Sequence, residues 1–196
     1  METIAVLVHG FNVVDPNRSI CGLTESLERI GYTVHKFLYG RAGFMDIRLS
    51  NDNLAWALLS QIHTIQHYAP DKRIIPIGHS NGCALIKKAG QLQDATNPAF
   101  SRCIYISPAL NTTATLGPQI TRCDVMHNVG DEVVKWSSYI PMNSWGRMGN
   151  IGYNGTDSRY VNHDCSQSIS GHSDWFRRGN IESYTAQALR SYLDLT

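Results

Sequence analysis

A serine between two glycines, in the string Gly78-His79-Ser80-Asn81-Gly82, is the residue best placed for covalent chemistry in this sequence. A serine hydroxyl is a weak nucleophile at neutral pH, so it attacks a carbonyl carbon only when a neighbouring base removes its proton. The Gly-x-Ser-x-Gly spacing by itself also describes an ordinary glycine-rich turn. Here an apolar stretch precedes it and a helical pattern follows, which is the context of a nucleophile elbow. A β-carbon at either glycine would crowd so sharp a bend.

An activated serine needs a base and a carboxylate that orients the base, and the downstream sequence offers both. In a fold that presents its nucleophile on such an elbow, the acid follows a later strand and the histidine lies nearer the C-terminus. Asp131 follows the predicted strand 124–129, and His172 directly precedes the last predicted helix. We therefore predict Ser80 as the nucleophile, His172 as the base and Asp131 as the orienting acid.

Other residues compete for these two roles. Of the eight histidines, His163 is the strongest rival for the base, because it lies in the same late loop and has Asp164 as its neighbour. Position favours His172, in the connection that enters the final helix, and the alternative stays open. For the acid, Asp124 would start its strand at the end away from the site, and Glu132 lies one residue too far along.

Acyl transfer also requires donors that face the negative oxygen of the tetrahedral intermediate, and one missing donor costs about 10²–10³ in rate. The backbone N–H of Asn81 directly follows the nucleophile and opens a helix, whose dipole favours negative charge. The backbone N–H of Phe11 is the second candidate, since the His9-Gly10-Phe11 segment follows the first predicted strand. A simple strand-ending turn would show the same pattern. The segment, the serine turn, the acid and the base occur in the expected chain order, however, and this favours an oxyanion hole.

The periodicity of the sequence predicts the elements that position these residues. Short apolar runs rich in β-branched residues alternate with longer helical patterns, which indicates βαβ units and a parallel sheet buried on both faces. Predicted strands cover residues 4–8, 32–38, 73–77, 103–107 and 124–129, with a sixth around 160–162, and predicted helices cover 19–30, 53–68, 83–92 and 175–193. The predicted fold class is α/β, a three-layer α/β/α sandwich with a mostly parallel sheet of about six strands, in a single domain over 1–196.

Length and composition narrow the class of protein further. The 196 residues are 42% hydrophobic, enough for a sizeable core. Lys and Arg number 17 against 16 Asp and Glu, so no net field attracts nucleic acid or an anionic membrane. The N-terminus lacks the pattern of a signal peptide, and no apolar run is long enough to cross a bilayer. We expect a soluble, cytoplasmic protein without a transmembrane segment.

The five cysteines show no regular spacing. Cys83, Cys103 and Cys123 fall in the predicted helix and strands of the core, so we expect reduced structural thiols. Cys21 and Cys165 lie in or near loops, and a disulfide between them stays open. No His-Glu-x-x-His or paired-cysteine spacing suggests a metal site, so a metal enzyme is the weakest reading and we expect no metal.

With these motifs in this order, the sequence resembles the α/β hydrolase superfamily, in particular its small lipase-like and esterase-like members. The resemblance covers nearly the whole chain and rests on Ser80, Asp131, His172 and the segment that ends in Phe11. It implies serine-based hydrolysis of an ester or thioester through an acyl-enzyme, without a cofactor. Two departures stand out: the family's first antiparallel strands look absent, and no large helical insertion follows Ser107, where many members carry a cap.

A core without a cap implies an open site. Its edges would be covered by the predicted loops 40–53, 109–121 and 139–171. Four aromatic residues in or near the last loop either line an acyl or sugar pocket or pack the loop onto the domain: Trp136, Trp145, Tyr153 and Tyr160. The expected activity is cleavage of a carboxylic ester on a small or polymer-borne substrate. The alternatives are an acyltransferase or deacylase acting on a bulky polysaccharide, lipid or peptidoglycan, and a non-catalytic binding protein on the same fold. The sequence specifies neither the substrate nor the oligomeric state.

Overall fold

Six strands form one sheet, in the order β2-β1-β3-β4-β5-β6, and each pair of neighbours is parallel. The strands are β1 (Thr3–Val8), β2 (Thr33–Phe37), β3 (Arg73–His79), β4 (Arg102–Ile106), β5 (Arg122–His127) and β6 (Tyr160–Asp164). The computed structural model describes residues 2–11, 19–39, 44–139 and 145–194, and of 44–50 the backbone alone. Because parallel strands end at the same edge, the segments that follow β1, β3 and β5 meet there, and these segments carry the predicted site residues.

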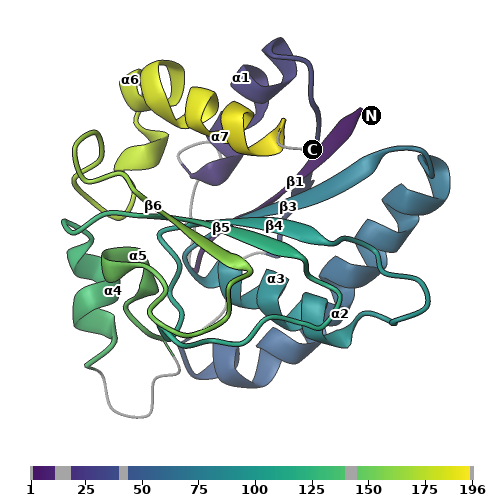
Figure 1. The fold of residues 1–196 in the computed structure, drawn as a ribbon, viewed down its shortest axis with the longest axis horizontal. Helices are drawn as coiled ribbons and strands as arrows, with labels where there is room; N and C mark the ends of the chain where they lie inside the picture. Colours follow the sequence, from purple (N-terminus) through teal and green to yellow (C-terminus); the bar gives the residue numbers. More distant parts are fainter. Residues whose placement is uncertain (1, 12–18, 40–43, 140–144, 195–196) are drawn as a thin grey trace.

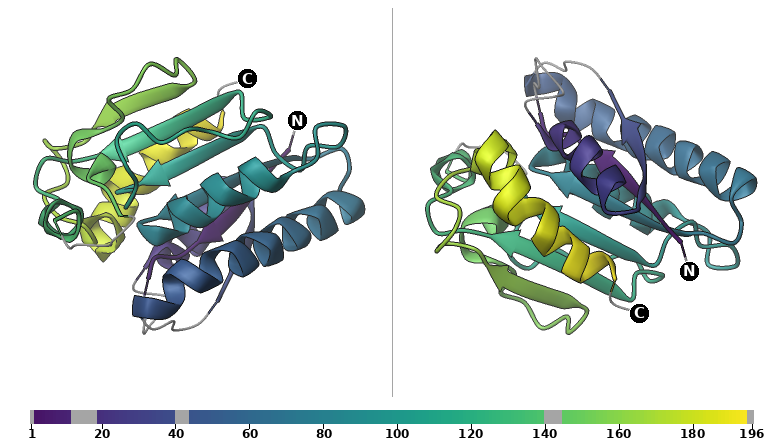
Figure 2. Two further views of the ribbon diagram at one scale, coloured as in Figure 1. Left: turned by 90° about the horizontal axis from the view of Figure 1, so that it is seen from below. Right: turned by 90° about the horizontal axis from the view of Figure 1, so that it is seen from above.

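Helices cover both faces of the sheet (Figures 1 and 2). One face carries α2 (Phe44–Tyr68) and α3 (Asn81–Leu92); the other carries η2 (Ile20–Leu23), α1 (Thr24–Arg29), α6 (Arg178–Asn180), the π-helical turn η4 (Ile181–Thr185) and α7 (Ala186–Leu193). Three short helices lie in the connections after β5 and β6: α4 (Glu132–Ser137), α5 (Met148–Ile151) and η3 (Asp174–Phe176). The predicted three-layer α/β/α class is confirmed, and the sheet is parallel throughout.

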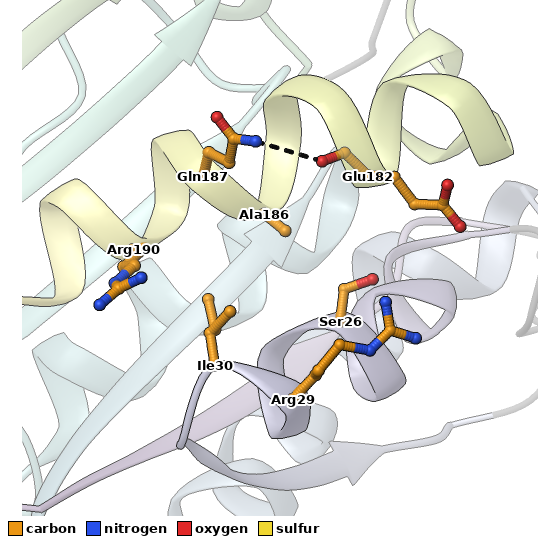
Figure 3. Close-up of a pocket in the computed structure, with 7 residues that line it drawn as sticks. All are labelled: Ser26, Arg29, Ile30, Glu182, Ala186, Gln187 and Arg190. Carbon is orange, nitrogen blue, oxygen red and sulfur yellow. Dashed lines mark hydrogen bonds between the residues drawn. The ribbon is translucent and has the colours of Figure 1, made fainter.

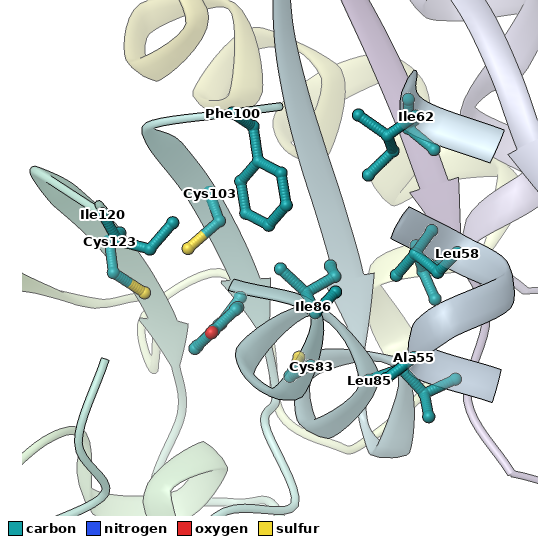
Figure 4. Packing of buried hydrophobic residues seen from close by; sticks show 14 of the residues in the cluster. Ala55, Leu58, Ile62, Cys83, Leu85, Ile86, Phe100, Cys103, Ile120 and Cys123 are labelled. Atoms are coloured by element: carbon teal, nitrogen blue, oxygen red, sulfur yellow. The ribbon is translucent and has the colours of Figure 1, made fainter. Parts of the chain in front are cut away.

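The core divides into two apolar clusters, one on each face of the sheet. In β1, Ile4, Val6 and Val8 belong to the cluster under α2 and α3, while Ala5 and Leu7 belong to the cluster under α1 and α7. Figure 4 shows part of the first cluster, in which side chains of α2 and α3 pack against those of β4 and β5. Strands buried on both faces read as continuous apolar runs, which is why the sequence predicted them well.

Helix α2 begins earlier in the chain than predicted. The predicted helix 53–68 begins at Phe44, so the loop expected over 40–53 is wrong from 44 onward, while 40–43 lie outside the described residues. The sequence between Asp46 and Asn53 is rich in polar residues, which hid the helical period. Within this helix, Asn51 lies against the serine turn, because its side chain exchanges hydrogen bonds with that of Asn81 (3.4 and 3.5 Å).

The closing helix also differs from its prediction over 175–193. The chain forms η3, turns at Arg177 with extended backbone (ψ 136°), and only then continues through α6 and η4 into α7. Trp175 is fully buried, and its indole N–H donates to the Ser107 hydroxyl over 2.8 Å, so burial of this one side chain favours the break. The structure adds two short helices that were not predicted: α4, which precedes the predicted loop 139–171, and α5, which lies within it.

All five cysteines are buried and free, so Cys21 and Cys165 form no disulfide. Both lie in the cluster under α1 and α7, where burial raises the pKa of each thiol. The expectation of reduced structural thiols is confirmed. Across the described ranges, the helices are too short or too polar to cross a lipid bilayer.

Candidate active site

Ser80 lies on the tight turn between β3 and α3, in a backbone conformation that side chains rarely adopt. Its φ of 54° and ψ of −121° carry a strain of roughly 1–3 kcal/mol. Three backbone hydrogen bonds hold the turn: the Ser80 N–H donates to the Ile106 carbonyl (3.1 Å), and the Ser80 carbonyl accepts from Cys83 (3.1 Å) and Ala109 (3.3 Å). Strain retained by surrounding structure is typical of functional sites, and here it presents the serine at the edge of the sheet.

The glycines around Ser80 permit close approach of three segments. A β-carbon on Gly78 would lie 2.8 Å from the Cys83 nitrogen, and one on Gly82 would lie 2.6 Å from the His9 carbonyl oxygen. Both contacts are with backbone, so neither could relax by a simple side-chain rotation. A β-carbon on Gly10 would lie 3.0 Å from that of Ser80, which places the turn after β1 directly against the serine. The steric reasoning about Gly78 and Gly82 is confirmed.

His172 and Asp131 form a buried pair. The His172 Nδ1 lies 3.0 Å and 2.9 Å from the two Asp131 carboxylate oxygens, and Asp131 is completely buried. The same carboxylate accepts the Val134 N–H over 3.2 Å and so caps α4, which fixes its direction. Since Nδ1 faces the acid, Nε2 is the ring nitrogen left to accept a proton from a substrate or a nucleophile.

The loop that carries His172 is positioned by the segment after β5. A β-carbon on Gly130 would lie 2.9 Å from the carbonyl carbon of Ser170, so only glycine allows the two backbones to touch. The fully buried Asn128 donates its amide to the Gly171 carbonyl over 3.5 Å, and the Ser170 hydroxyl donates to Asp174 over 2.7 Å. The acid and the base therefore reach each other through contacts of their own loops as well as through their side chains.

His79, the residue before Ser80, joins the serine turn to His172. Its Nε2 donates to the His172 carbonyl over 2.9 Å, and the two imidazole rings lie 4.6 Å apart. Phe176 meets the other side of the His79 ring edge-on at 4.8 Å. Burial, with the nearby His172, holds the pKa of His79 well below its usual value, so the ring stays neutral. Since a carbonyl can only accept, Nε2 carries the proton.

Ser80 is linked to the base through its chain neighbour His79, and no direct hydrogen bond between the two is described. No hydrogen bond joins the Ser80 hydroxyl to His172 or to any other residue that the structure describes. Catalytic hydrogen bonds are often long or misaligned without substrate and tighten when it binds. The acid and the base are thus in contact, and the predicted hydrogen bond from the nucleophile to the base is not among the described interactions.

Two backbone amides in the turns at Ser80 and after β1 are candidates for oxyanion donors. Within the described ranges, no carbonyl accepts the N–H of Phe11 or of Asn81, the two predicted oxyanion donors. His9 fixes the turn before Phe11, because its ring stacks on Tyr39 at 4.1 Å and its Nε2 accepts the Tyr39 N–H over 3.2 Å. The Tyr39 hydroxyl in turn donates to the His9 carbonyl over 2.8 Å.

The rival base, His163, belongs to a different cluster. Its Nε2 lies 2.9 Å from an oxygen of Asp124, and its ring stacks on Tyr192 of α7 at 4.0 Å. The same buried carboxylate pairs with Arg122 at 2.8 Å and Arg102 at 3.6 Å. These groups tie α7 to β4 and β5, so the cluster acts as a structural ion network. His163 makes no contact with Ser80 among the described interactions.

The four aromatic residues considered for a pocket have separate roles. Tyr153 and Tyr160 stack at 3.9 Å and pack on the core, which favours the packing role over a pocket lining. Trp136 is 66% exposed. Trp145 alone lies beside the serine turn: its indole donates to the Asn81 side-chain oxygen over 3.3 Å, and its ring meets Phe11 at 5.6 Å.

Comparisons with known proteins support the fold. No protein-family model and no curated protein matches the sequence. Phospholipase PlaB from Legionella pneumophila, in complex with thio-NAD, matches at a TM-score of 0.65 and 16% identity over 98% of this chain and 59% of that one. A serine hydrolase without a lid from Xanthomonas campestris matches at 0.63 and 13% identity over 99% and 84% of the two chains. An extracellular α/β-hydrolase from a Paenibacillus species matches at 0.61 and 12% identity over 100% of both.

The chain therefore has the α/β hydrolase fold, as the resemblance implied, and it spans less than two thirds of the phospholipase's length. Sequence reasoning missed two residues near the site. It treated His79 as a motif neighbour and gave Asn128 no role, although both contact the loop that carries His172. An imidazole next to the nucleophile was a signal available from the sequence, whereas nothing in the sequence marked Asn128.

Proposed function

We propose that this protein is a serine hydrolase that cleaves a carboxylic ester through an acyl-enzyme on Ser80. The observation that carries the proposal is the buried Asp131–His172 pair, bridged through His79 to a serine on a strained turn. Acyl transfer requires an imidazole oriented by a carboxylate, a serine within its reach, and backbone amides for the oxyanion; here two amides are available that donate to no carbonyl of the described residues. The names of the structural neighbours, a phospholipase and a serine hydrolase among them, agree with a hydrolase.

The reaction follows from these groups. The Ser80 oxygen bonds to the ester carbonyl carbon while His172 Nε2 takes the hydroxyl proton. Asp131 stabilises the imidazolium that forms. The amides of Phe11 and Asn81 bind the oxyanion. When the tetrahedral intermediate collapses, the carbon–oxygen bond to the alcohol breaks and His172 returns the proton to the leaving oxygen. Water then gives a proton to His172 and attacks the acyl-enzyme carbonyl. As the bond to Ser80 breaks, His172 returns that proton to the Ser80 oxygen and the acid is released.

A second candidate keeps these residues and changes the substrate. The segments around the serine turn leave an open groove along α3, so a bulky acylated polymer or lipid also fits as substrate, with either water or a second alcohol as acceptor. Activity on short esters compared with acetylated polysaccharide or phospholipid vesicles separates the two. A non-catalytic binding protein is the third candidate, and it predicts that Ser80→Ala leaves the biological activity unchanged.

The proposal is tested by labelling and turnover. Wild-type protein should react with a fluorophosphonate at Ser80 and hydrolyse p-nitrophenyl esters, while Ser80→Ala should lose both, with a decrease in kcat of at least about 10⁴-fold. Peptide mass spectrometry locates the label. Absence of labelling together with absence of turnover of short esters by folded wild-type protein contradicts the proposal.

The choice of base has a matched control in the chain. His172→Ala should lower kcat by about 10⁴-fold or more, because the serine loses its base. His163→Ala should leave kcat/KM within about twofold and instead lower the melting temperature, since it leaves buried Asp124 with one partner fewer. If the two variants exchanged these outcomes, the assignment of the base would be wrong.

A further inference from the structure

Two cavities outside the serine turn differ in how their charges are balanced. Figure 3 shows the first, about 160 Å³ between α1 and the C-terminal helices, lined by Ser26, Arg29, Ile30, Glu182, Ala186, Gln187 and Arg190. Each arginine in it already has a carboxylate partner: Arg29 pairs with Glu25 at 2.9 Å and Arg190 with Asp194 at 3.6 Å. This cavity offers a negatively charged ligand no free cation.

The second cavity is an open groove of about 330 Å³, which we call the α3 groove. It is lined by Asn51, Asp52, Ala84, Lys87, Lys88, Ala109, Leu110 and Trp145. It begins beside the candidate nucleophile, because Ala109 donates to the Ser80 carbonyl over 3.3 Å and Trp145 donates to the Asn81 side chain over 3.3 Å. The spacing of Ala84, Lys87 and Lys88 places them on one face of α3, so the groove follows this helix away from Ser80.

The two lysines of the α3 groove are not equivalent. Lys88 forms an ion pair with Asp52 at 2.9 Å. Lys87 lies half-buried with only a 3.5 Å hydrogen bond to the neutral Gln91 side chain, and no carboxylate among the described residues lies within ion-pair distance of it. Burial, together with Lys88, lowers the pKa of the Lys87 ammonium. A half-buried cation without a counter-ion is stabilised by any anion that enters the groove.

We propose that the α3 groove binds an anionic group of the substrate, with Lys87 as its ion partner and Trp145 as the apolar wall next to the reacting carbonyl. The inference rests on the ester hydrolysis proposed above and names its substrate class. At a rise of about 1.5 Å per residue, the helix separates Ser80 from Lys87 by about 10 Å. The substrate is therefore an ester whose carboxylate or phosphate lies a medium-length chain away from the carbonyl that Ser80 attacks.

The test compares esters of matched length with and without the charge. The acyl arm uses the mono-p-nitrophenyl ester of suberate against p-nitrophenyl octanoate, and the alcohol arm uses acetoxyhexyl phosphate against hexyl acetate. In at least one arm, wild-type protein should prefer the charged ester. Lys87→Met should lower kcat/KM for that ester about three- to fivefold, the range of a partly exposed ion pair, and leave its neutral counterpart unchanged. A preference in the acyl arm identifies the anionic group as a carboxylate on the acyl chain, and a preference in the alcohol arm identifies it as a phosphate on the alcohol.

The matched control is Lys72→Met. Lys72 pairs with Glu2 at 2.6 Å, and neither lines the α3 groove, so this variant should keep the preference while changing the net charge equally. Added salt should reduce the wild-type preference. An equal loss on charged and neutral esters in Lys87→Met, or no preference by wild-type protein in either arm, overturns the inference while leaving ester hydrolysis intact.

A binding measurement keeps the inference testable without turnover. Suberate and hexyl phosphate are titrated calorimetrically into wild-type protein and into Lys87→Met and Lys72→Met. At least one of them should bind about three- to fivefold more weakly to Lys87→Met than to the other two proteins. Equal affinities for all three proteins overturn the inference. Failure of the proposed function appears instead as absence of hydrolysis of every ester, charged or neutral.

Discussion

Two serines hold left-handed backbone conformations, and the contrast between them indicates which one is free to react. Ser80 (φ 54°) and Ser107 (φ 45°) are the non-glycine residues with positive φ in the described ranges, and they follow adjacent strands, β3 and β4. The Ser107 hydroxyl is buried and accepts the Trp175 indole N–H over 2.8 Å. The Ser80 hydroxyl makes no hydrogen bond to a described residue. Backbone strain is therefore shared by both serines, while availability of the hydroxyl distinguishes Ser80.

At the same scale, His79 should act as a positioning residue through His172. His79→Ala removes the donor to the His172 carbonyl and the ring contact, so kcat and the rate of fluorophosphonate labelling should fall about 10- to 100-fold with little change in KM. His79→Gln retains a side-chain N–H and should recover part of the loss. His67→Ala, at an exposed position near the end of α2, is the control and should leave the kinetics unchanged. A normal kcat in folded His79→Ala would disprove the positioning role.

At the scale of elements, the contact of α3 with the end of β1 depends on Gly82. A β-carbon there would overlap the Val8 carbonyl and lie 2.6 Å from that of His9. Gly82→Ala should therefore lower the free energy of unfolding by about 1–3 kcal/mol and reduce activity, because it displaces the turn that carries Phe11. Gly179→Ala is the matched control. Nothing lies within 4 Å of a β-carbon at Gly179 in α6, so this change should be neutral or add about 0.4–1 kcal/mol.

The two alanine variants are compared by urea unfolding and by hydrolysis of p-nitrophenyl esters. A Gly82→Ala protein as stable and as active as wild type would mean that α3 and β1 can separate at no cost. That result would contradict the close packing that the two backbones show at this junction.

Helices and strands were predictable from the sequence where one hydrophobic periodicity dominated. They were not predictable where the burial of a single side chain determined where an element begins or breaks. The strands 4–8 and 73–77 and the turn at Ser80 followed from apolar runs and glycine spacing, and the structure confirms them. The first turns of α2 were hidden by polar residues, and the break at Arg177 depends on where Trp175 is buried, which no local pattern records. Within the site, residue types and chain order indicated Asp131 and His172, but not the contacts of His79 and Asn128 with their loop.

At the scale of the whole molecule, an ion network and a set of buried neutral histidines respond to acid in different ranges of pH. Asp124 has its pKa lowered by hydrogen bonds from His163 and Arg122, which outweigh its burial. Its contribution to stability is complete above the unfolded pKa near 3.8 and is lost below it. The network around Asp124 therefore stabilises the packing of α7 on the sheet at both neutral and mildly acidic pH.

The buried histidines should cause loss of stability at a higher pH. Burial lowers the pKa of His9, His79 and His127, so the unfolded chain, with a pKa near 6.5 for each, binds more protons than the fold as pH decreases. Stability should thus be constant above about pH 7.5 and decrease as pH falls through 6.5, by up to about 1.4 kcal/mol per pH unit for each histidine. Urea unfolding between pH 7.5 and 5 measures the slope. His127→Gln should flatten it and the exposed control His67→Gln should not, whereas a stability that stayed level down to pH 5 would mean that these rings accept protons inside the fold.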